Sequence, residues 1–191
     1  MFDMHCVIFA GGKSSRMRTD KSLLPFGDYN TLVEYQYERM KKIFKYVSIS
    51  TKSSEKVPFT CNIIEDPKGI DTFAPTAGFV ALFNRLSAEK VFVLSVDTPF
   101  VGINEITQLI NCDAPDFDAI IAKTAQGMHP MCGIYHRSLH SKFTCMLQED
   151  NHRLGKLLKE SKTYFVNFEN EKAFANLNYP HEYEEALNAL P

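Results

Sequence analysis

A glycine pair near the start of the chain is followed by a cluster of cationic side chains. The apolar run Cys6–Ala10 leads directly into Gly11 and Gly12. The cations that follow are Lys13, Arg16, Arg18 and Lys21. Glycines let backbone N–H groups approach a ligand closely, and clustered cations neutralise phosphate oxygens. The pattern predicts a polyphosphate-binding loop that is neither a Walker A nor a G-x-G-x-x-G motif, and a turn with solvated charges is the alternative.

One carboxylate stands directly after the most apolar run of the chain. Val91–Val96 predicts a buried strand, Asp97 follows it, and Pro99 marks a turn. A carboxylate at the carboxyl end of a buried strand is well placed to hold a hard divalent cation through oxygen. Two other roles are open from the sequence, because Asp97 could also cap the next helix or brace the turn.

Apolar runs alternate with helical patterns along the chain. The predicted strands are Cys6–Ala10, Tyr46–Ser50, Asn62–Ile64, Val91–Val96, Asp118–Ala122, Cys132–Tyr135 and Tyr164–Phe168. The predicted helices are Thr31–Lys45, Ala77–Leu86, Ile103–Ile110, Arg137–Glu149 and His181–Leu190. Continuous apolar strands separated by amphipathic helices predict an α/β fold with three layers, in which helices cover both faces of a mostly parallel sheet. Ligands of such sheets bind outside the carboxyl ends of the strands, where both segments described above would lie.

Length, charge and cysteine usage narrow the class of protein. The 191 residues and the absence of a linker or repeat predict one domain with a substantial core. A formal net charge of −2 and a pI of about 6.3 argue against a nucleic-acid partner. The longest apolar run is too short to cross a membrane. Five cysteines without a C-x-x-C pair are typical of a reducing compartment, so we expect a cytoplasmic location without a membrane partner.

The glycine segment resembles a known signature. Residues 9–26 read FAGGKSSRMRTDKSLLPF, which is similar to the nucleotidyltransferase pattern [LF]-A-G-G-x-S-x-R-M-G-x-[DN]-K. The ending Asp-Lys-Ser-Leu-Leu-Pro is most similar to the MobA-type molybdenum cofactor guanylyltransferases. Arg18 departs from the pattern, because a glycine usually follows Arg-Met in the family. The resemblance implies a Rossmann-like nucleotidyltransferase fold.

Other segments resemble the same family over nearly the whole chain. Val96–Phe100 is similar to C-D-[TM]-P-[FY], Ile64–Asp66 to I-x-D, and Asn176–Pro180 to N-[IV]-N-T-P. Ser50 stands where the family has an asparagine that contacts the guanosine, so it could make one hydrogen bond but not the paired contacts of an amide. Read alone, Asp66 is a turn former and Asn178 a helix N-cap.

The resemblance implies that the chain transfers GMP from GTP to molybdenum-molybdopterin in a Mg²⁺-dependent reaction that releases pyrophosphate. It implies catalytic roles for Arg16, Lys21 and Asp97, with the metal on Asp97. The implied GTP-binding residues are Phe9, Ala10, Gly11, Gly12, Lys21, Ser50, Asp66 and Asp97. Asn176 and Asn178 would bind molybdopterin. The chain would then be a single domain over 1–191, with a GTP-binding portion (1–125) and an acceptor portion that binds molybdopterin (126–191). Molybdoenzymes or cofactor-delivery proteins are possible protein partners.

Two other classes of function compete with this interpretation. A related nucleotidyltransferase would use CTP on molybdopterin, or a nucleoside triphosphate on a sugar or isoprenoid phosphate. A nucleotide-binding regulator would keep the loop without turnover. The presence of both Lys21 and Asp97 argues against the regulator, because a pure binding protein has less need of a metal ligand.

Overall fold

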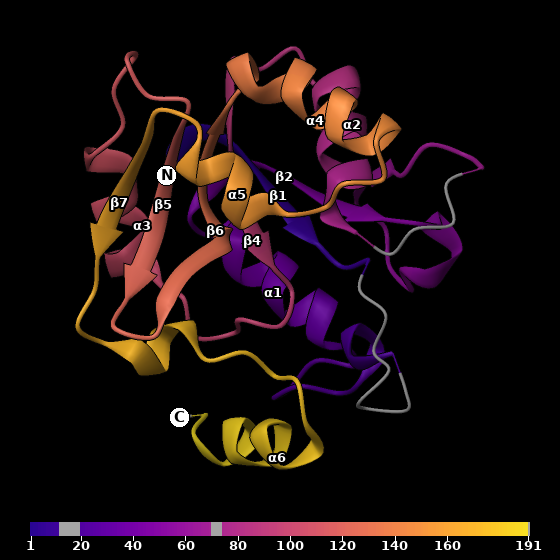
Figure 1. The fold of residues 1–191 in the computed structure, drawn as a ribbon. Coiled ribbons are helices and arrows are strands. Elements are labelled where there is room, and N and C mark those ends of the chain that lie inside the picture. The colour runs from indigo at the N-terminus through magenta and orange to yellow at the C-terminus, as the bar shows by residue number, and fades with distance from the viewer. Residues whose placement is uncertain (12–19, 70–73, 191) are drawn as a thin grey trace.

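The computed structural model describes residues 1–11, 20–69 and 74–190 and contains a seven-stranded sheet (Figure 1). The strands are β1 (Phe2–Phe9), β2 (Phe44–Thr51), β3 (Asn62–Glu65), β4 (Lys90–Ser95), β5 (Ala119–Thr124), β6 (Gly127–His136) and β7 (Thr163–Asn167). The helices are α1 (Leu32–Lys41), α2 (Pro75–Arg85), α3 (Ile103–Asn111), α4 (His140–Gln148), α5 (Leu154–Lys159) and α6 (Pro180–Asn188). Short 3-10 turns are η1 (Lys21–Leu23), η2 (Ser54–Lys56), η3 (Arg137–Leu139) and η4 (Glu171–Phe174).

The sheet is mostly parallel, as predicted. Its strand order is β3-β2-β1-β4-β6-β5-β7. β1 pairs in parallel with β2 and β4, β2 with β3, and β5 with β7, whereas β6 runs antiparallel to β4 and β5. The carboxyl ends of β1, β2, β3 and β4 therefore meet at one edge of the sheet.

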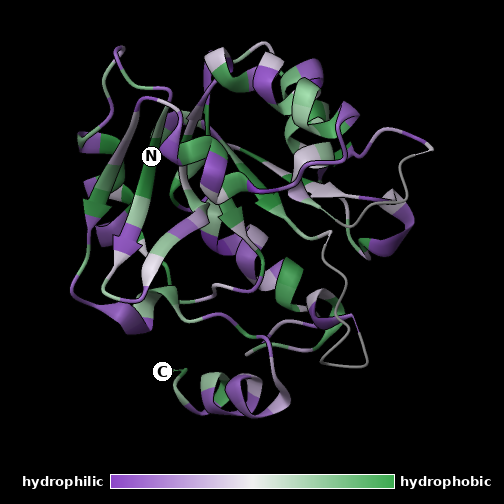
Figure 2. Cartoon of the chain, viewed as in Figure 1, coloured by the Kyte–Doolittle hydropathy of each residue, from purple (hydrophilic) through white to green (hydrophobic). Residues whose placement is uncertain are grey.

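Helices cover both faces of this sheet, because successive strand residues point to opposite sides. On β4, Phe92 and Leu94 join a core with α1, α3 and α6, whereas Val91 and Val93 join a core with α2, α4 and α5. Figure 1 shows α2 and α4 together on one side and α1 on the other, and Figure 2 shows hydrophobic residues along the central strands. Within the described residues no helix is long and apolar enough to cross a membrane.

The starts of three helices follow from local chemistry. Thr31 precedes α1, and its hydroxyl accepts a hydrogen bond of 3.2 Å from the amide of Glu34. Pro75 and Pro180 occupy first-turn positions of α2 and α6. Proline has no N–H to leave unpaired there, and its fixed φ is already helical.

The first helix is shorter than the sequence predicted. α1 ends at Lys41 rather than Lys45, and β2 begins at Phe44. The prediction was wrong because Ile43 and Phe44 continue the helical spacing of apolar residues. In the fold Phe44 is buried in the sheet, where its ring centroid lies 5.1 Å from that of Phe92.

β6 is longer than the predicted strand, and the sequence did not predict its direction. The sequence predicted a strand over Cys132–Tyr135, but β6 spans Gly127–His136 and runs antiparallel to its neighbours. Its register against β5 shifts between Ile121 and Ala122, opposite the stretch that contains Pro130. Proline cannot donate to a ladder and is found at such irregularities, so a proline inside the segment concealed the strand.

The predicted helix over Arg137–Glu149 is divided, and a further helix follows it. The first turn is the 3-10 segment η3, and the α-helix begins only at His140. The short helix α5 was not predicted, because its six residues are too few to display a helical period.

The packing around Gly133 generates a stability prediction. A Cβ at this position on β6 would lie 2.1 Å from the carbonyl oxygen of Ile120, so the backbone must shift to accept alanine. Overpacking typically costs about 1–3 kcal/mol, and we expect Gly133→Ala to lower the free energy of unfolding by at least that much. Gly155→Ala on α5 is the matched control, because its nearest neighbour is Met128 Sδ at 3.6 Å. Urea denaturation of both variants tests this, and equal stability of the two would contradict it.

Candidate active site

A small cavity opens at the carboxyl ends of the parallel strands. Its volume is about 140 Å³. The residues that line it are Phe9, Gly11, Ser50, Asp66, Ala74, Pro75, Gly78, Ser95 and Met131. Four residues predicted to bind the nucleotide, Phe9, Gly11, Ser50 and Asp66, thus share one cavity, and Ser95 and Met131 are lining residues that sequence reasoning missed.

The wall of this cavity depends on a close approach of α2 to the sheet. A Cβ at Gly78 would lie 2.5 Å from Phe9 Cε1 and 2.8 Å from Ser50 Oγ. Ala10 follows β1, and its amide donates to the carbonyl of Ser50 at 2.8 Å. A backbone hydrogen bond thus joins the ends of β1 and β2, and the side chains of Phe9 and Ser50 pack directly against Gly78 of α2, which leaves a narrow space between them.

Asp66 brings a carboxylate to the same cavity. It follows β3, and its amide donates to the carbonyl of Thr51 at 3.0 Å. Burial raises the pKa of Asp66 above its ordinary value, and the nearby positive charge of Lys52 partly opposes the shift. The turn-forming role considered from the sequence does not account for this position, because the residue lines the cavity.

The predicted catalytic pair Lys21 and Asp97 is in direct contact. Lys21 begins η1, and Asp97 lies two residues after the end of β4. The distance from Lys21 Nζ to Asp97 Oδ2 is 2.5 Å, and the side chains are only 13% and 15% exposed. This contact joins the glycine segment to the end of β4, as the parallel sheet predicts.

The second carboxylate oxygen of Asp97 is also engaged. Ser95 Oγ donates to Asp97 Oδ1 at 2.5 Å, and Thr98 Oγ1 donates to the carbonyl of Ser95 at 2.9 Å. Asp97 does not cap α3, whose N-cap residue is Gly102. The helix-cap alternative is therefore wrong, and the carboxylate faces Lys21 instead.

The segment before α6 completes this cluster. The amide of Leu177 donates to the carbonyl of Asp97 at 2.9 Å. Lys21 Nζ donates to the carbonyl of Leu177 at 3.1 Å and to Asn178 Oδ1 at 3.3 Å. Residues from the start, middle and end of the chain thus meet at one ammonium group.

The side chain of Asn178 is not a helix cap. The carboxylate of Glu182 accepts from the amides of Asn178 and Tyr179 at 2.7 and 2.9 Å, so Glu182 satisfies the donors of the N-cap residue and of the residue before it. The amide oxygen of Asn178 faces Lys21 instead. The capping alternative for Asn178 is therefore wrong.

A larger groove of about 740 Å³ lies beside the 176–178 segment. Asn176 and Asn178 line it, together with residues of η4, α3 and α6. His129 lies in the groove with its ring stacked on Phe174 at a centroid distance of 4.8 Å, and burial lowers the pKa of His129. The groove thus offers amide groups and a stacked aromatic pair next to Lys21.

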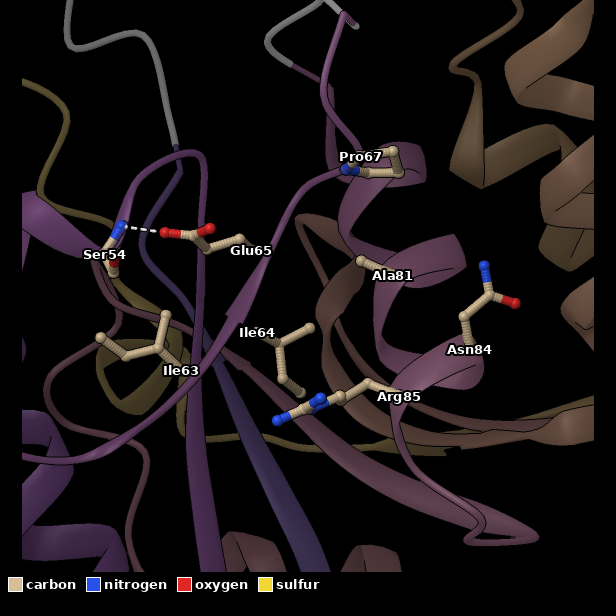
Figure 3. Close-up of a pocket in the computed structure, with 8 residues that line it drawn as sticks. All are labelled: Ser54, Ile63, Ile64, Glu65, Pro67, Ala81, Asn84 and Arg85. Atoms are coloured by element: carbon tan, nitrogen blue, oxygen red, sulfur yellow. Dashed lines mark hydrogen bonds between the residues drawn. The ribbon is translucent and has the colours of Figure 1, made fainter.

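A third cavity, of about 550 Å³, lies at the outer edge of the sheet between β3 and α2. Figure 3 shows the amide of Ser54 donating to Glu65 at its rim, with Arg85 on the opposite wall. None of the residues that line it is a predicted site residue. The predicted site residues lie instead at the small cavity and the groove described above.

Two predicted residues, Gly12 and Arg16, lie outside the described ranges. In the part of the chain that the structure describes, no group of three or more His, Cys, Asp or Glu side chains gathers to hold a metal ion by itself. Asp97 is the carboxylate at the β4 end of the site. A single carboxylate suits a cation that arrives together with phosphate ligands.

An α/β sheet with a cavity at the carboxyl ends of its strands and a lysine–aspartate pair beside it suits the binding of a phosphorylated ligand. A model of the MobA-like NTP transferase domain matches residues 6–164. The chain belongs to this family.

The chain is similar to relatives over nearly its full length. It is 41% identical to a molybdenum cofactor guanylyltransferase from Campylobacter jejuni subsp. doylei, covering 98% of this chain and 97% of that protein. The crystal structure of molybdopterin-guanine dinucleotide biosynthesis protein A from Archaeoglobus fulgidus shares the fold, with a TM-score of 0.82, 17% identity and 97% coverage of each chain. A Mycobacterium tuberculosis H37Rv protein solved in complex with manganese has a TM-score of 0.72 and 12% identity, covering 99% of this chain and 100% of its own.

The burial of Asp66 generates a pH prediction. Because its pKa is raised in the folded state, the stability linked to this group is complete below the unfolded-state pKa of about 3.8 and is lost as the pH rises through the folded-state pKa. Asp66→Asn should therefore raise the free energy of unfolding at pH 7, and the gain should shrink toward zero in acid. Urea denaturation across this range measures the effect.

Asp28→Asn is the control for the loss of one negative charge, because Asp28 is exposed. It should change stability little at either end of the range. A gain for Asp66→Asn that does not depend on pH, or a loss at pH 7, would contradict the role of burial.

Proposed function

We propose that this chain transfers GMP from GTP to molybdopterin, giving the molybdopterin guanine dinucleotide cofactor and pyrophosphate. The curated relative from Campylobacter jejuni, matched over nearly the full length, supports this proposal. The observation that carries the assignment of roles is the contact of Lys21 with both Asp97 and Asn178. One cation thereby lies between the nucleotide side and the acceptor side of the site.

The nucleotide portion, residues 1–125, would hold GTP at the strand ends. Ser50 offers a hydroxyl and Asp66 a carboxylate in the small cavity, and these groups can accept or donate toward a base edge or ribose. Phe9, Ala10 and the two glycines would contact the nucleotide mainly through the backbone. Arg16 and Lys21 would neutralise the polyphosphate.

The donor set fits Mg²⁺ delivered with GTP. Mg²⁺ is commonly held by one or two carboxylates together with substrate phosphates, and Asp97 provides one carboxylate beside the nucleotide cavity. When bound, the cation would neutralise charge on the polyphosphate. The manganese-bound structural relative supports a divalent metal in this fold.

Lys21 and Asp97 must separate for this arrangement to form. In the structure each neutralises the other, since Lys21 Nζ contacts Asp97 Oδ2. A polyphosphate would offer Lys21 a competing anion. Asp97 Oδ2 would then be available to hold a cation, while Ser95 still donates to Oδ1. The pair thus keeps both charges neutralised in the structure, and Lys21 and Asp97 are the residues that would exchange this contact for nucleotide and cation.

The chemical step needs positioning and charge neutralisation rather than a protein nucleophile. The acceptor's terminal phosphate attacks the α-phosphorus of GTP, a new P–O bond forms, and the bond to pyrophosphate breaks. A phosphate acceptor is already ionised, so no general base is required. Lys21 stabilises the charge that moves onto the leaving pyrophosphate.

The acceptor portion, residues 126–191, would bind molybdopterin in the groove beside Asn176 and Asn178. Amide side chains can both donate and accept toward a pterin edge without adding charge next to the acceptor phosphate. The contact of Asn178 with Lys21 puts this groove adjacent to the proposed phosphate position. Molybdoenzymes or cofactor-delivery proteins would then receive the product.

Pyrophosphate release from GTP tests the proposed reaction. It should require molybdopterin and should exceed release from CTP. Lys21→Ala and Asp97→Ala should each lower it by about 10²-fold or more, which is the scale of removing one electrostatic stabiliser. Lys41→Ala is the control, since Lys41 is exposed and contacts Glu38 and the ring of Tyr37 on α1, away from the site. Near-normal turnover by folded Asp97→Ala, or equal use of CTP, would overturn the assignment.

The role of Asn178 has its own test. Asn178→Ala should weaken molybdopterin binding while the dissociation constant for GTP stays near the wild-type value, because the amide faces the groove and Glu182 still caps α6. Both affinities and the melting temperature are measured on one preparation. Asn111→Ala, at the exposed end of α3, is the control. A loss of stability with unchanged molybdopterin affinity would remove Asn178 from the acceptor site.

A further inference from the structure

A buried amide on α1 contacts the loop that carries Asp97. Gln36 is fully buried, and its Nε2 lies 3.0 Å from the carbonyl oxygen of Thr98 and 3.4 Å from that of Val96. A third carbonyl, that of Ser95, lies 3.5 Å away. The amide of Gln36 thus faces backbone carbonyls on both sides of Asp97.

Arg39, one turn further along α1, extends this contact. Its Nη1 donates to the carbonyl of Pro99, and its Nη2 donates to the carbonyl of Val101 at 2.9 Å. Arg39 Nη1 also donates to Gln36 Oε1 at 2.8 Å. Because a guanidinium only donates, this bond fixes the orientation of the Gln36 amide and directs its NH₂ group to the loop.

The side chains of Gln36 and Arg39 supply hydrogen-bond donors to buried carbonyls of the loop that follows β4. Buried carbonyls require hydrogen-bond partners, and the residues after β4 have left the ladder that would supply them. α1 therefore supplies the missing donors from about sixty positions earlier in the chain.

We propose that Gln36 and Arg39 are positioning residues that clamp the backbone around Asp97 and thereby hold its carboxylate in place for the metal-bound nucleotide. The proposal rests on the metal role of Asp97 given above. Leu177 holds the carbonyl of Asp97 itself, so the residue is fixed along its backbone while its side chain faces Lys21. Functional groups need such support, because a site that is loose by about an ångström loses most of its effect.

Arg137 provides a matched control at the opposite end of β4. Its guanidinium donates to the carbonyl of Phe83 near the end of α2 and to the carbonyls of Leu86 and Ala88 in the loop before β4. It makes the same kind of clamp on a loop without proposed site residues. Loss of this clamp should cost stability and leave metal-dependent binding intact.

Equilibrium binding of GTP, measured by calorimetry with Mn²⁺ and again with EDTA, tests the proposal. The measured quantity is the gain in GTP affinity that Mn²⁺ provides. Gln36→Met and Arg39→Met should each reduce this gain by roughly 10- to 100-fold, the usual effect of removing a group that orients a metal ligand. Affinity in EDTA should stay within about twofold, since neither residue reaches the nucleotide cavity. Arg137→Met should keep the full gain.

The outcomes separate positioning from general stability. If Arg137→Met loses the gain as strongly as Arg39→Met, or if Gln36→Met and Arg39→Met keep it, the positioning role is wrong. Arg39→Lys, which can still donate to one carbonyl, should retain part of the gain and provides a milder variant if Arg39→Met does not fold. Asp97→Asn is the reference variant. If Asp97→Asn keeps the full Mn²⁺-dependent gain in GTP affinity, the metal role of Asp97 is wrong. If Asp97→Asn loses the gain but Gln36→Met keeps it, only the positioning role of Gln36 and Arg39 is wrong.

Discussion

The ion pair between Lys21 and Asp97 is the interaction on which the arrangement of the site depends. Both side chains are largely buried, so each charge requires the other until a ligand replaces it. The ammonium group of Lys21 also contacts Leu177 and Asn178, so the segment before α6 is hydrogen-bonded to the segment that follows β1. Tyr183 on α6 adds a second contact between these two segments, because its hydroxyl donates to the carbonyl of Pro25. The acceptor side therefore cannot be placed independently of the nucleotide side.

The mostly parallel sheet explains why these residues meet. β1, β2, β3 and β4 all end at one edge, and Gly11, Ser50, Asp66 and Asp97 each follow or close one of these strands. The antiparallel strand β6 inserts beside β4 and brings Met131 to the same cavity. The sheet thus brings the site residues at the ends of β1 to β4 and on β6 close together, and Leu177 and Asn178, in the segment before α6, complete the site.

Sequence reasoning identified the fold class because the strands are continuous apolar runs and the loops that follow carry the polar residues. It could not identify the antiparallel course of β6, since direction depends on pairing with distant strands, and Pro130 concealed its length. It also missed Gln36, which lies on the buried face of α1 among apolar neighbours. That position is itself a signal, because a polar side chain on a core face must find partners, but only the fold reveals that these are loop carbonyls. Residues 12–19 lie outside the described ranges, so Arg16 stays a prediction.

A crystal structure with GTP and Mn²⁺ bound would show whether Lys21 and Asp97 exchange their contact for nucleotide and cation, since anomalous scattering locates the metal. We expect Lys21 Nζ to leave Asp97 and contact the polyphosphate, Asp97 to coordinate Mn²⁺, and the loop carbonyls to stay bonded to Gln36 and Arg39. A nucleotide complex in which the Lys21–Asp97 contact is intact and the metal lies away from Asp97 would contradict it.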